Sequence, residues 1–163
     1  MDFYMKLPRN KKEFTLFLLV ISIVSVNIIA PLITFLEVGF SKETYFNTLQ
    51  VIPFIWLFVV ILVLLTHTPA EKITKKIIHK DDSFNSVVTI NILVNVLLMS
   101  IFMTIIGTWI GSRSVTFDVF HNYLNVWPRN FAISLAIELL IAHPVARLIL
   151  YKLHISKDKQ KAA

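Results

Sequence analysis

The chain has 163 residues, of which 56% are hydrophobic and only 16% are charged, and its formal net charge is +6. Soluble domains carry about 25% charged residues, so this composition is typical of a membrane protein. The sequence contains no cysteine, which excludes disulfides, thiol catalysis and zinc–thiolate sites. The Lys and Arg residues flank apolar stretches and do not mark a folded basic face, which argues against a nucleic-acid partner.

Four apolar stretches follow one another along the chain, each close to the ~20 residues that a helix needs to cross a bilayer. They cover residues 14–35, 49–66, 86–110 and 127–150. Buried strands are shorter, and strands of a membrane barrel alternate apolar with polar residues, so a β-structure is excluded. We therefore expect an all-α polytopic membrane protein with four transmembrane helices, arranged as two tandem hairpins of parallel orientation.

Charged segments separate these stretches and predict the topology. We expect a cytoplasmic N-terminal segment (1–13), a first transmembrane hairpin (14–69), a basic cytoplasmic linker (70–82), a second transmembrane hairpin (83–150) and a basic cytoplasmic tail (151–163). Basic residues favour the cytoplasmic side of a membrane, so the short loops 36–48 and 111–126 should face outside. Thirteen of the 16 Lys and Arg residues lie in the parts expected to be cytoplasmic or, for Arg147, at the cytoplasmic end of the fourth span: Lys6, Arg9, Lys11, Lys12, Lys72, Lys75, Lys76, Lys80, Arg147, Lys152, Lys157, Lys159 and Lys161.

The stretch Ala70–Lys80 places isoleucines at helical spacing among its lysines. One interpretation is an amphipathic helix that lies on anionic lipid. The other is a helical extension of the second span, whose lysines only fix the topology.

An internal repeat appears when the chain is compared with itself at an offset of 75 residues. Asn47 and Pro53 then align with Asn122 and Pro128, within a shared pattern that leads into the second and fourth spans. Proline is tolerated in the first turn of a helix, and asparagine is a good N-cap. The pattern is therefore either a device that starts these helices or part of a site, and we expect the first.

Glu138 is the strongest candidate for a functional residue. It lies about eleven residues, or roughly 16 Å, into the fourth span, near the middle of the bilayer. An ionised carboxylate at that depth costs about 2.5–3.5 kcal/mol on insertion scales, so it must be protonated, paired or hydrated. Candidate partners at similar depth are Ser134 and Asn130 on the same helix face, Asn95 and Asn91 in the third span, and Asn27 and Ser25 in the first.

These polar residues allow two interpretations. They either surround a polar cavity between the first, third and fourth spans, or they hold helices together by hydrogen bonds. His143, near the cytoplasmic end of the fourth span, is a candidate proton relay or a local hydrogen-bond donor. Arg129 should lie on nearly the opposite helix face from Glu138 and extend to the outer interface.

The fourth span also carries a run that resembles a known family. Residues Trp127–Phe131, then Glu138–Leu140 and His143–Arg147, are similar to a family of small bacterial membrane proteins of unknown function, whose repeating unit is a two-helix hairpin. The resemblance covers residues 83–153 and is degenerate over the first hairpin. It implies the hairpin fold and a bacterial plasma (inner) membrane, and it implies no activity.

We find no phosphate-binding loop, no metal-ligand cluster and no nucleophile with a nearby base in the sequence. We therefore expect neither an enzyme nor a cofactor or metal site. Two hypotheses remain. The first is a small carrier of a small-molecule cargo, working as a homodimer, with Glu138 as its proton-responsive group. The second is a non-transporting scaffold or accessory subunit that binds another membrane protein or a lipid.

Overall fold

The computed structural model describes residues 7–79 and 81–162, with side chains up to residue 158. Lys6 and Lys80 of the predicted topology lie outside the described residues, as do the side chains of Lys159 and Lys161. The described chain is all-α and holds no strand. Its elements are α1 (Lys11–Val38), α2 (Lys42–Ile77), α3 (Phe84–Ser112), α4 (Asp118–His121), α5 (Tyr123–Ile137), a π-helical turn η2 (Glu138–Ala142) and α6 (His143–Ala162).

Four helices of the described chain are long and apolar enough to cross a membrane, as the sequence predicts. They are α1, α2, α3 and the continuous helical segment Tyr123–Asp158, which runs through α5 and η2 into α6. Large apolar side chains cover much of their outer surface, among them Phe54, Leu64 and Leu140. In a water-soluble bundle this surface would be costly to expose, whereas against lipid it is the expected composition.

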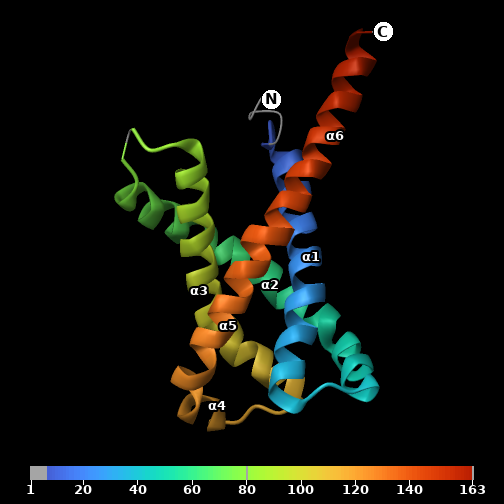
Figure 1. Ribbon diagram of the computed structural model, residues 1–163, viewed down its shortest axis with the longest axis vertical. Helices are drawn as coiled ribbons and strands as arrows, with labels where there is room; N and C mark the ends of the chain where they lie inside the picture. Colours follow the sequence, from blue (N-terminus) through green and yellow to red (C-terminus); the bar gives the residue numbers. More distant parts are fainter. Residues whose placement is uncertain (1–6, 80, 163) are drawn as a thin grey trace.

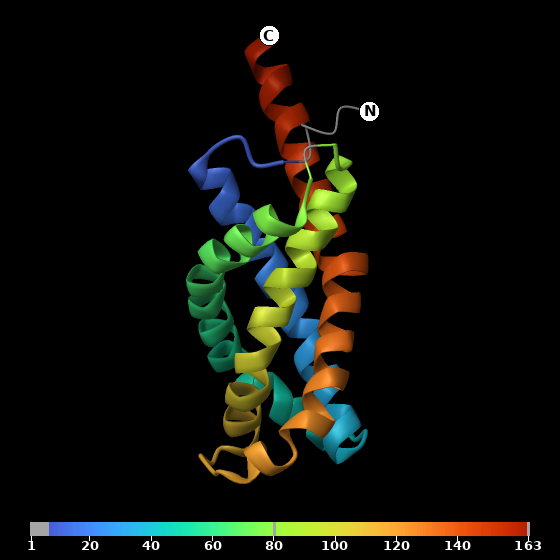
Figure 2. The same cartoon turned by 90° about the vertical axis from the view of Figure 1, so that its left-hand side faces the viewer.

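The four membrane helices pack as a ring. α1 contacts α2, α2 contacts α3, α3 contacts α5, and α5 contacts α1. The start of α1, residues 78–79 and 81–83, and the last turns of α6 lie at one end of the molecule, which we call the terminal end (Figures 1 and 2). The connection 39–41 and the segment 113–122 lie at the other end, which we call the loop end. α1 and α3 therefore both start from the terminal end.

The helices at the loop end start and stop differently from the prediction. α2 begins at Lys42, so the first loop has only three residues, and Ser41 caps the helix by accepting a hydrogen bond from the Thr44 N–H at 2.9 Å. Asn47 and Pro53 thus lie inside α2, and the predicted capping role of Asn47 is wrong. Asn122 does stand at the N-cap position of α5, but its side chain makes no capping hydrogen bond.

The basic stretch after the second span is helical. α2 continues through Ile77, with Lys72, Lys75 and Lys76 exposed on it, and Pro69 inside it. The last turns of α2 bend away from the direction of the rest of the helix (Figure 2). Proline accounts for such a bend, because it removes one backbone hydrogen bond and clashes with the preceding turn. Both interpretations of this stretch expected a helix, and the structure has one that continues α2. Whether this helix lies on lipid stays a prediction.

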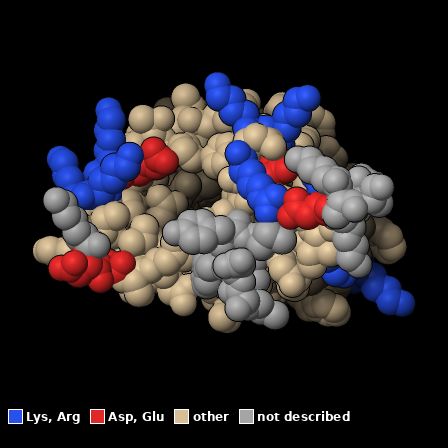
Figure 3. Space-filling model, turned by 90° about the horizontal axis from the view of Figure 1, so that it is seen from above, with Lys and Arg blue, Asp and Glu red and all other residues tan. Residues whose placement is uncertain are grey.

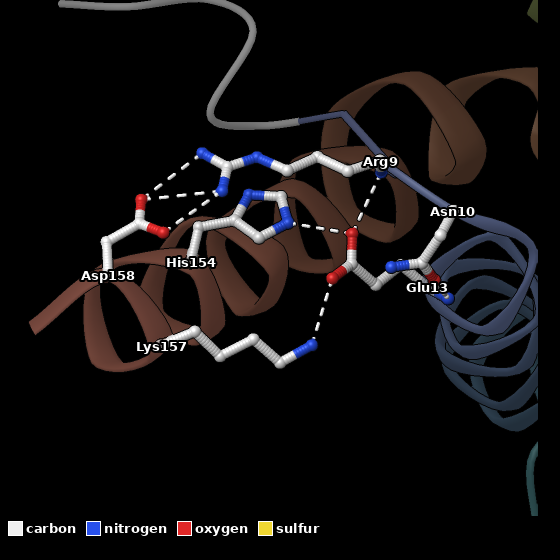
Figure 4. Close-up of polar contacts among 6 residues, drawn as sticks. All are labelled: Arg9, Asn10, Glu13, His154, Lys157 and Asp158. Atoms are coloured by element: carbon white, nitrogen blue, oxygen red, sulfur yellow. Dashed lines mark hydrogen bonds and ion pairs between the residues drawn. The ribbon is translucent and has the colours of Figure 1, made fainter. Parts of the chain in front are cut away.

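α1 and α6 are tied together at the terminal end by Glu13, whose residue is only 4% exposed. Its carboxylate accepts from the Arg9 backbone N–H at 2.8 Å and from Lys157 Nζ at 3.0 Å, and lies 2.9 Å from Nε2 of the fully buried His154 (Figure 4). The hydrogen bond from His154 is the main reason why the pKa of Glu13 is lowered to about 2. This cluster fixes the position of α6, and through it the π turn that carries Glu138.

Candidate functional site

Glu138 lies where the regular helix of α5 ends and the π turn η2 begins. The backbone N–H of His143 donates to the carbonyl oxygen of Glu138, a bond that spans five residues. Pro144 follows directly and has no N–H to continue an α-helical pattern, which gives the π turn a local physical cause. Turns of this type occur frequently at functional sites. Nothing in the apolar spacing of the span predicts it.

The Glu138 carboxylate faces α1. Its Oε1 accepts a hydrogen bond of 2.5 Å from Oγ of Ser25, which is itself buried. Ser25 is one of the partners expected from the sequence, whereas Asn27 and Asn95 do not contact the carboxylate through any hydrogen bond of the described residues. The side chain of Glu138 is only 15% exposed.

The second carboxylate oxygen faces the next turn of its own helix. Oε2 of Glu138 lies 3.6 Å from Nε2 of His143, too far for a hydrogen bond, and it is buried with no hydrogen-bond partner among the described residues. Nδ1 of His143 is likewise buried with no hydrogen-bond partner among the described residues. The His143 ring packs edge-on against Phe17 of α1, with ring centroids 5.7 Å apart. One oxygen of Glu138 is therefore held in place, and the other is buried without a hydrogen-bond partner among the described residues.

A cavity of about 620 Å³, which we call the loop-side cavity, lies inside the ring of helices. Residues of α1, α2, α3 and α5 line it, from the loop end, where Glu37 and Arg113 border it, down to Glu138. Its walls are mainly apolar and include Val26, Val51, Ile55, Val59, Met99 and Met103. The polar residues that border it away from the loop end include Ser25, Asn130, Ser134 and Glu138, together with Ser100 and Thr104 of α3. A pocket of this size, apolar with a few convergent polar groups, is typical of small-molecule sites.

The polar stripe predicted on the fourth span is thus brought together. Asn130 is 6% exposed, and Asn130, Ser134 and Glu138 all border the loop-side cavity. Arg129 does not border it. Nη2 of Arg129 pairs with Oε1 of Glu37 at 2.8 Å, with both side chains about a third exposed (36% and 32%). That pairing with the end of α1 is not predicted from the sequence.

The remaining predicted residues lie elsewhere. Asn91 donates to Oγ1 of Thr74 at 3.4 Å, and Asn95 accepts from Oγ1 of Thr66 at 3.2 Å, so both face α2. Asn27 is exposed, and its Nδ2 bonds the carbonyl oxygen of Ile23 on its own helix. None of the three borders the loop-side cavity. Their position fits the helix-packing interpretation.

A smaller pocket of about 120 Å³, which we call the terminus-side pocket, lies on the other side of the Glu138–His143 pair. It is bordered by Asn85 and Thr89 in the first turns of α3 and by His143 and Arg147 of α6. His143 thus borders one void while its Nε2 faces Glu138, which borders the other. The sequence gives no signal for Asn85 and Thr89, since polar residues at the start of a membrane helix are ordinary.

Comparison with known proteins finds a similarity for the second hairpin. No curated protein and no solved structure matches the chain. Residues 87–154 match a family described as a domain of unknown function (DUF2798). The matched segment runs from α3 into α6 and contains Glu138, His143 and Arg147. Over this segment the chain is similar to an uncharacterised family, and the segment includes three residues of the candidate site, Glu138, His143 and Arg147.

Proposed function

We propose that this small membrane protein is a carrier for a small, largely apolar molecule, with Glu138 as its proton-responsive group. The observation that carries the proposal is the loop-side cavity of about 620 Å³, which reaches Glu138 at its deep end. A void of that size inside a four-helix ring is not needed for helix packing, because protein interiors are otherwise filled to a high density. Its mainly apolar walls favour an apolar cargo, and its polar residues favour a cargo with one polar end.

The carboxylate of Glu138 supplies a way to couple cargo and protons. A charged carboxylate deep in a membrane is costly unless it is paired, so a cargo group or a proton must compensate it. Ser25 holds Oε1, while Oε2 has no hydrogen-bond partner among the described residues. In the proposed cycle, Oε2 binds either the polar end of the cargo or a proton, and one displaces the other.

His143 is the proposed relay for that proton. Its Nε2 lies 3.6 Å from Oε2 of Glu138, and a small shift of either side chain brings the two atoms within hydrogen-bond distance. The same ring borders the terminus-side pocket. A proton released by Glu138 can thereby pass to the side of the molecule opposite the loop-side cavity.

The proposal also covers the orientation of the carrier, the membrane it lies in and its oligomeric state. The basic residues gather at the terminal end, which by the positive-inside rule is the cytoplasmic one, and the family resemblance favours a bacterial plasma membrane. The dimer prediction assumed that four helices enclose little space, and the loop-side cavity contradicts that premise. The single chain has room for a cargo, and the oligomeric state itself stays a prediction.

An alternative role is a non-transporting accessory subunit. The observation in its favour is that Asn91 and Asn95 bond α2, so part of the intramembrane polarity serves helix packing. Such contacts are worth about 0.6 kcal/mol each in membrane proteins.

The test replaces Glu138 by Gln, with Glu43→Gln as the matched control, because Glu43 is exposed at the start of α2. Cells lacking their own exporters express each variant and are challenged with a panel of small amphiphilic toxic compounds. The carrier predicts that E138Q loses tolerance to one or more compounds, while its abundance and melting temperature match those of E43Q. If E138Q keeps full tolerance, or loses only stability, the carrier is refuted and the accessory role gains.

A further inference from the structure

The terminus-side pocket lies at a fork between two helices. α6 packs on α1, whereas α3 packs on the π turn and α5 below it. The two helices diverge toward the terminal end (Figure 1). The pocket occupies the base of this fork and is lined by the first turns of α3 and by residues 139–147 of the fourth span. Asn85 and Thr89 are exposed at its rim, so a ligand can reach it from the surface.

The polar groups around this pocket are mainly hydrogen-bond donors. Arg147 is always positively charged, and Asn85 and Thr89 each add a donor from α3. Nε of Arg147 and Nδ1 of His143 are buried without a hydrogen-bond partner among the described residues. An unpartnered, partly buried guanidinium is costly, which means that the site is incomplete without an acceptor.

None of the described residues that border the pocket carries a carboxylate to supply that acceptor. Glu138 lies across His143 and borders the loop-side cavity instead. Asp82, just before α3, accepts a hydrogen bond from the backbone N–H of His79 at 2.7 Å and is not among the lining residues. The charge that faces the pocket from the elements around it is therefore the positive charge of Arg147.

The dimensions and the setting identify the class of ligand. One water needs about 10–15 Å³ of such space, so a pocket of about 120 Å³ accepts a polyatomic group. The planar fork of Arg matches the oxygens of phosphate. Viewed from the terminal end, Lys and Arg side chains lie in two groups on either side of a recess, with Asp and Glu side chains beside each group (Figure 3). An excess of basic side chains raises the local concentration of anions.

We propose that the terminus-side pocket binds a phosphate group, with Arg147 as its main ligand and Asn85 and Thr89 as further donors. The group belongs either to the head of an anionic phospholipid or to free phosphate. The site stands independently of the proposed transport, because it is built on Arg147 and α3 and its test contains no cargo.

The experiment measures binding to the purified full chain in two arms. In the first, the protein is placed in nanodiscs with rising fractions of phosphatidylglycerol in phosphatidylcholine. In the second, sodium phosphate is titrated at constant ionic strength into protein held in pure phosphatidylcholine. The thermal midpoint gives an apparent affinity in each arm. The variants are Arg147→Gln, Thr89→Val and the control Lys152→Gln, an exposed residue of α6 that loses the same charge.

The proposal expects one arm to stabilise the protein and Arg147→Gln to weaken that affinity by about tenfold or more, as for loss of a charge-assisted hydrogen bond. Thr89→Val should weaken it by a smaller factor, and Lys152→Gln should leave it unchanged. A response to phosphatidylglycerol alone assigns the phosphate to a lipid; a response to free phosphate assigns it to the solute.

Three results overturn the site: no stabilisation in either arm, equal losses for Arg147→Gln and Lys152→Gln, or normal binding by a folded Arg147→Gln. If Arg147→Gln does not fold, Thr89→Val decides, since its side chain is exposed. Weakened binding by that variant supports the site, and unchanged binding rejects it.

Discussion

Replacing Glu13 by Gln tests the cluster that joins α1 to α6. Gln has nearly the same shape but no charge, and only one of its two terminal atoms accepts hydrogen bonds. In the native protein both carboxylate oxygens are used, one by Lys157 and the other by Arg9 and His154. In the variant, the amide NH₂ group must face at least one of these donors.

The expected cost follows from the burial of each partner. Hydrogen bonds to a charged group contribute about 1.5–3 kcal/mol, and the contact with the fully buried His154 belongs to this class. The contact with Lys157, whose side chain is 51% exposed, adds at most about 1 kcal/mol. We expect E13Q to lower the free energy of unfolding by about 2–4 kcal/mol, within the range for breaking a buried pair.

Asp158→Asn is the matched control for this prediction. Asp158 pairs with Arg9 at 3.2 Å between the same two segments, but the side chains are 43% and 45% exposed, so its loss should cost less than about 1 kcal/mol. The assay is reversible unfolding in mixed micelles, followed by circular dichroism. If E13Q costs no more than D158N, the stability of this end does not depend on the burial of Glu13, and the reasoning fails.

Three further predictions use the same assay. Because the pKa of Glu13 is lowered, its contribution to stability is complete above its ordinary pKa of 4.5 and is lost as the pH falls toward about 2. The unfolding midpoint of the native protein should therefore fall over this pH range, and E13Q should lack this part of the fall. Ser25→Ala removes the donor to Glu138 and should cost about 0.6–1.7 kcal/mol, whereas the exposed Ser114→Ala should cost almost nothing; equal effects would contradict the assigned hydrogen bond. Arg129→Gln breaks the partly exposed pair with Glu37 and should cost about 1 kcal/mol or less, and a larger loss would mean that this pair closes the ring of helices.

The spans could be predicted because the length of an apolar stretch is set by the bilayer, whatever the helices contact. The ends of the helices could not be predicted in this way, because polar residues occur both in the last turns of a helix and in the loop that follows it. Residues Lys42–Thr48 are polar enough to read as a loop, yet Ser41 caps the helix before them. The spacing of apolar residues does not predict the π turn either, although Pro144 provides a local physical cause for it.

Part of the site was predictable for a different reason. A carboxylate inside an apolar stretch is costly, so Glu138 stands out in the sequence, and helical spacing places Ser134 and Asn130 on its face. Its partner on another helix depends on how each helix is rotated about its axis, and sequence spacing does not fix that rotation. As a result Ser25, not Asn95 or Asn27, holds Glu138, while Asn91 and Asn95 turn toward α2.

Two carboxylates, Glu13 and Glu138, make contacts between α1 and the fourth span. Their different hydrogen bonding shows why Glu138, and not Glu13, is the candidate for function. Glu13 is surrounded by donors on both oxygens, from the backbone of Arg9 and from the side chains of His154 and Lys157. A carboxylate saturated in this way stays charged and in one place, which suits a structural tie. Glu138 has one side-chain donor, Ser25, whose hydroxyl also lies 2.8 Å from the Ile21 carbonyl oxygen, and a second oxygen with no hydrogen-bond partner among the described residues.

That second oxygen, Oε2, is the atom through which the bonding or protonation of Glu138 can change. Its nearest basic group, Nε2 of His143, lies 3.6 Å away, and Glu138 itself borders the loop-side cavity. A partly satisfied carboxylate can take a proton, a cargo group or a closer histidine without giving up the contact that holds it. Each exchange alters the charge at the π turn, where the described residues of the fourth span depart from regular α-helix. Glu138 is therefore the stronger candidate for a functional residue, because its hydrogen bonding is incomplete, whereas that of Glu13 is complete.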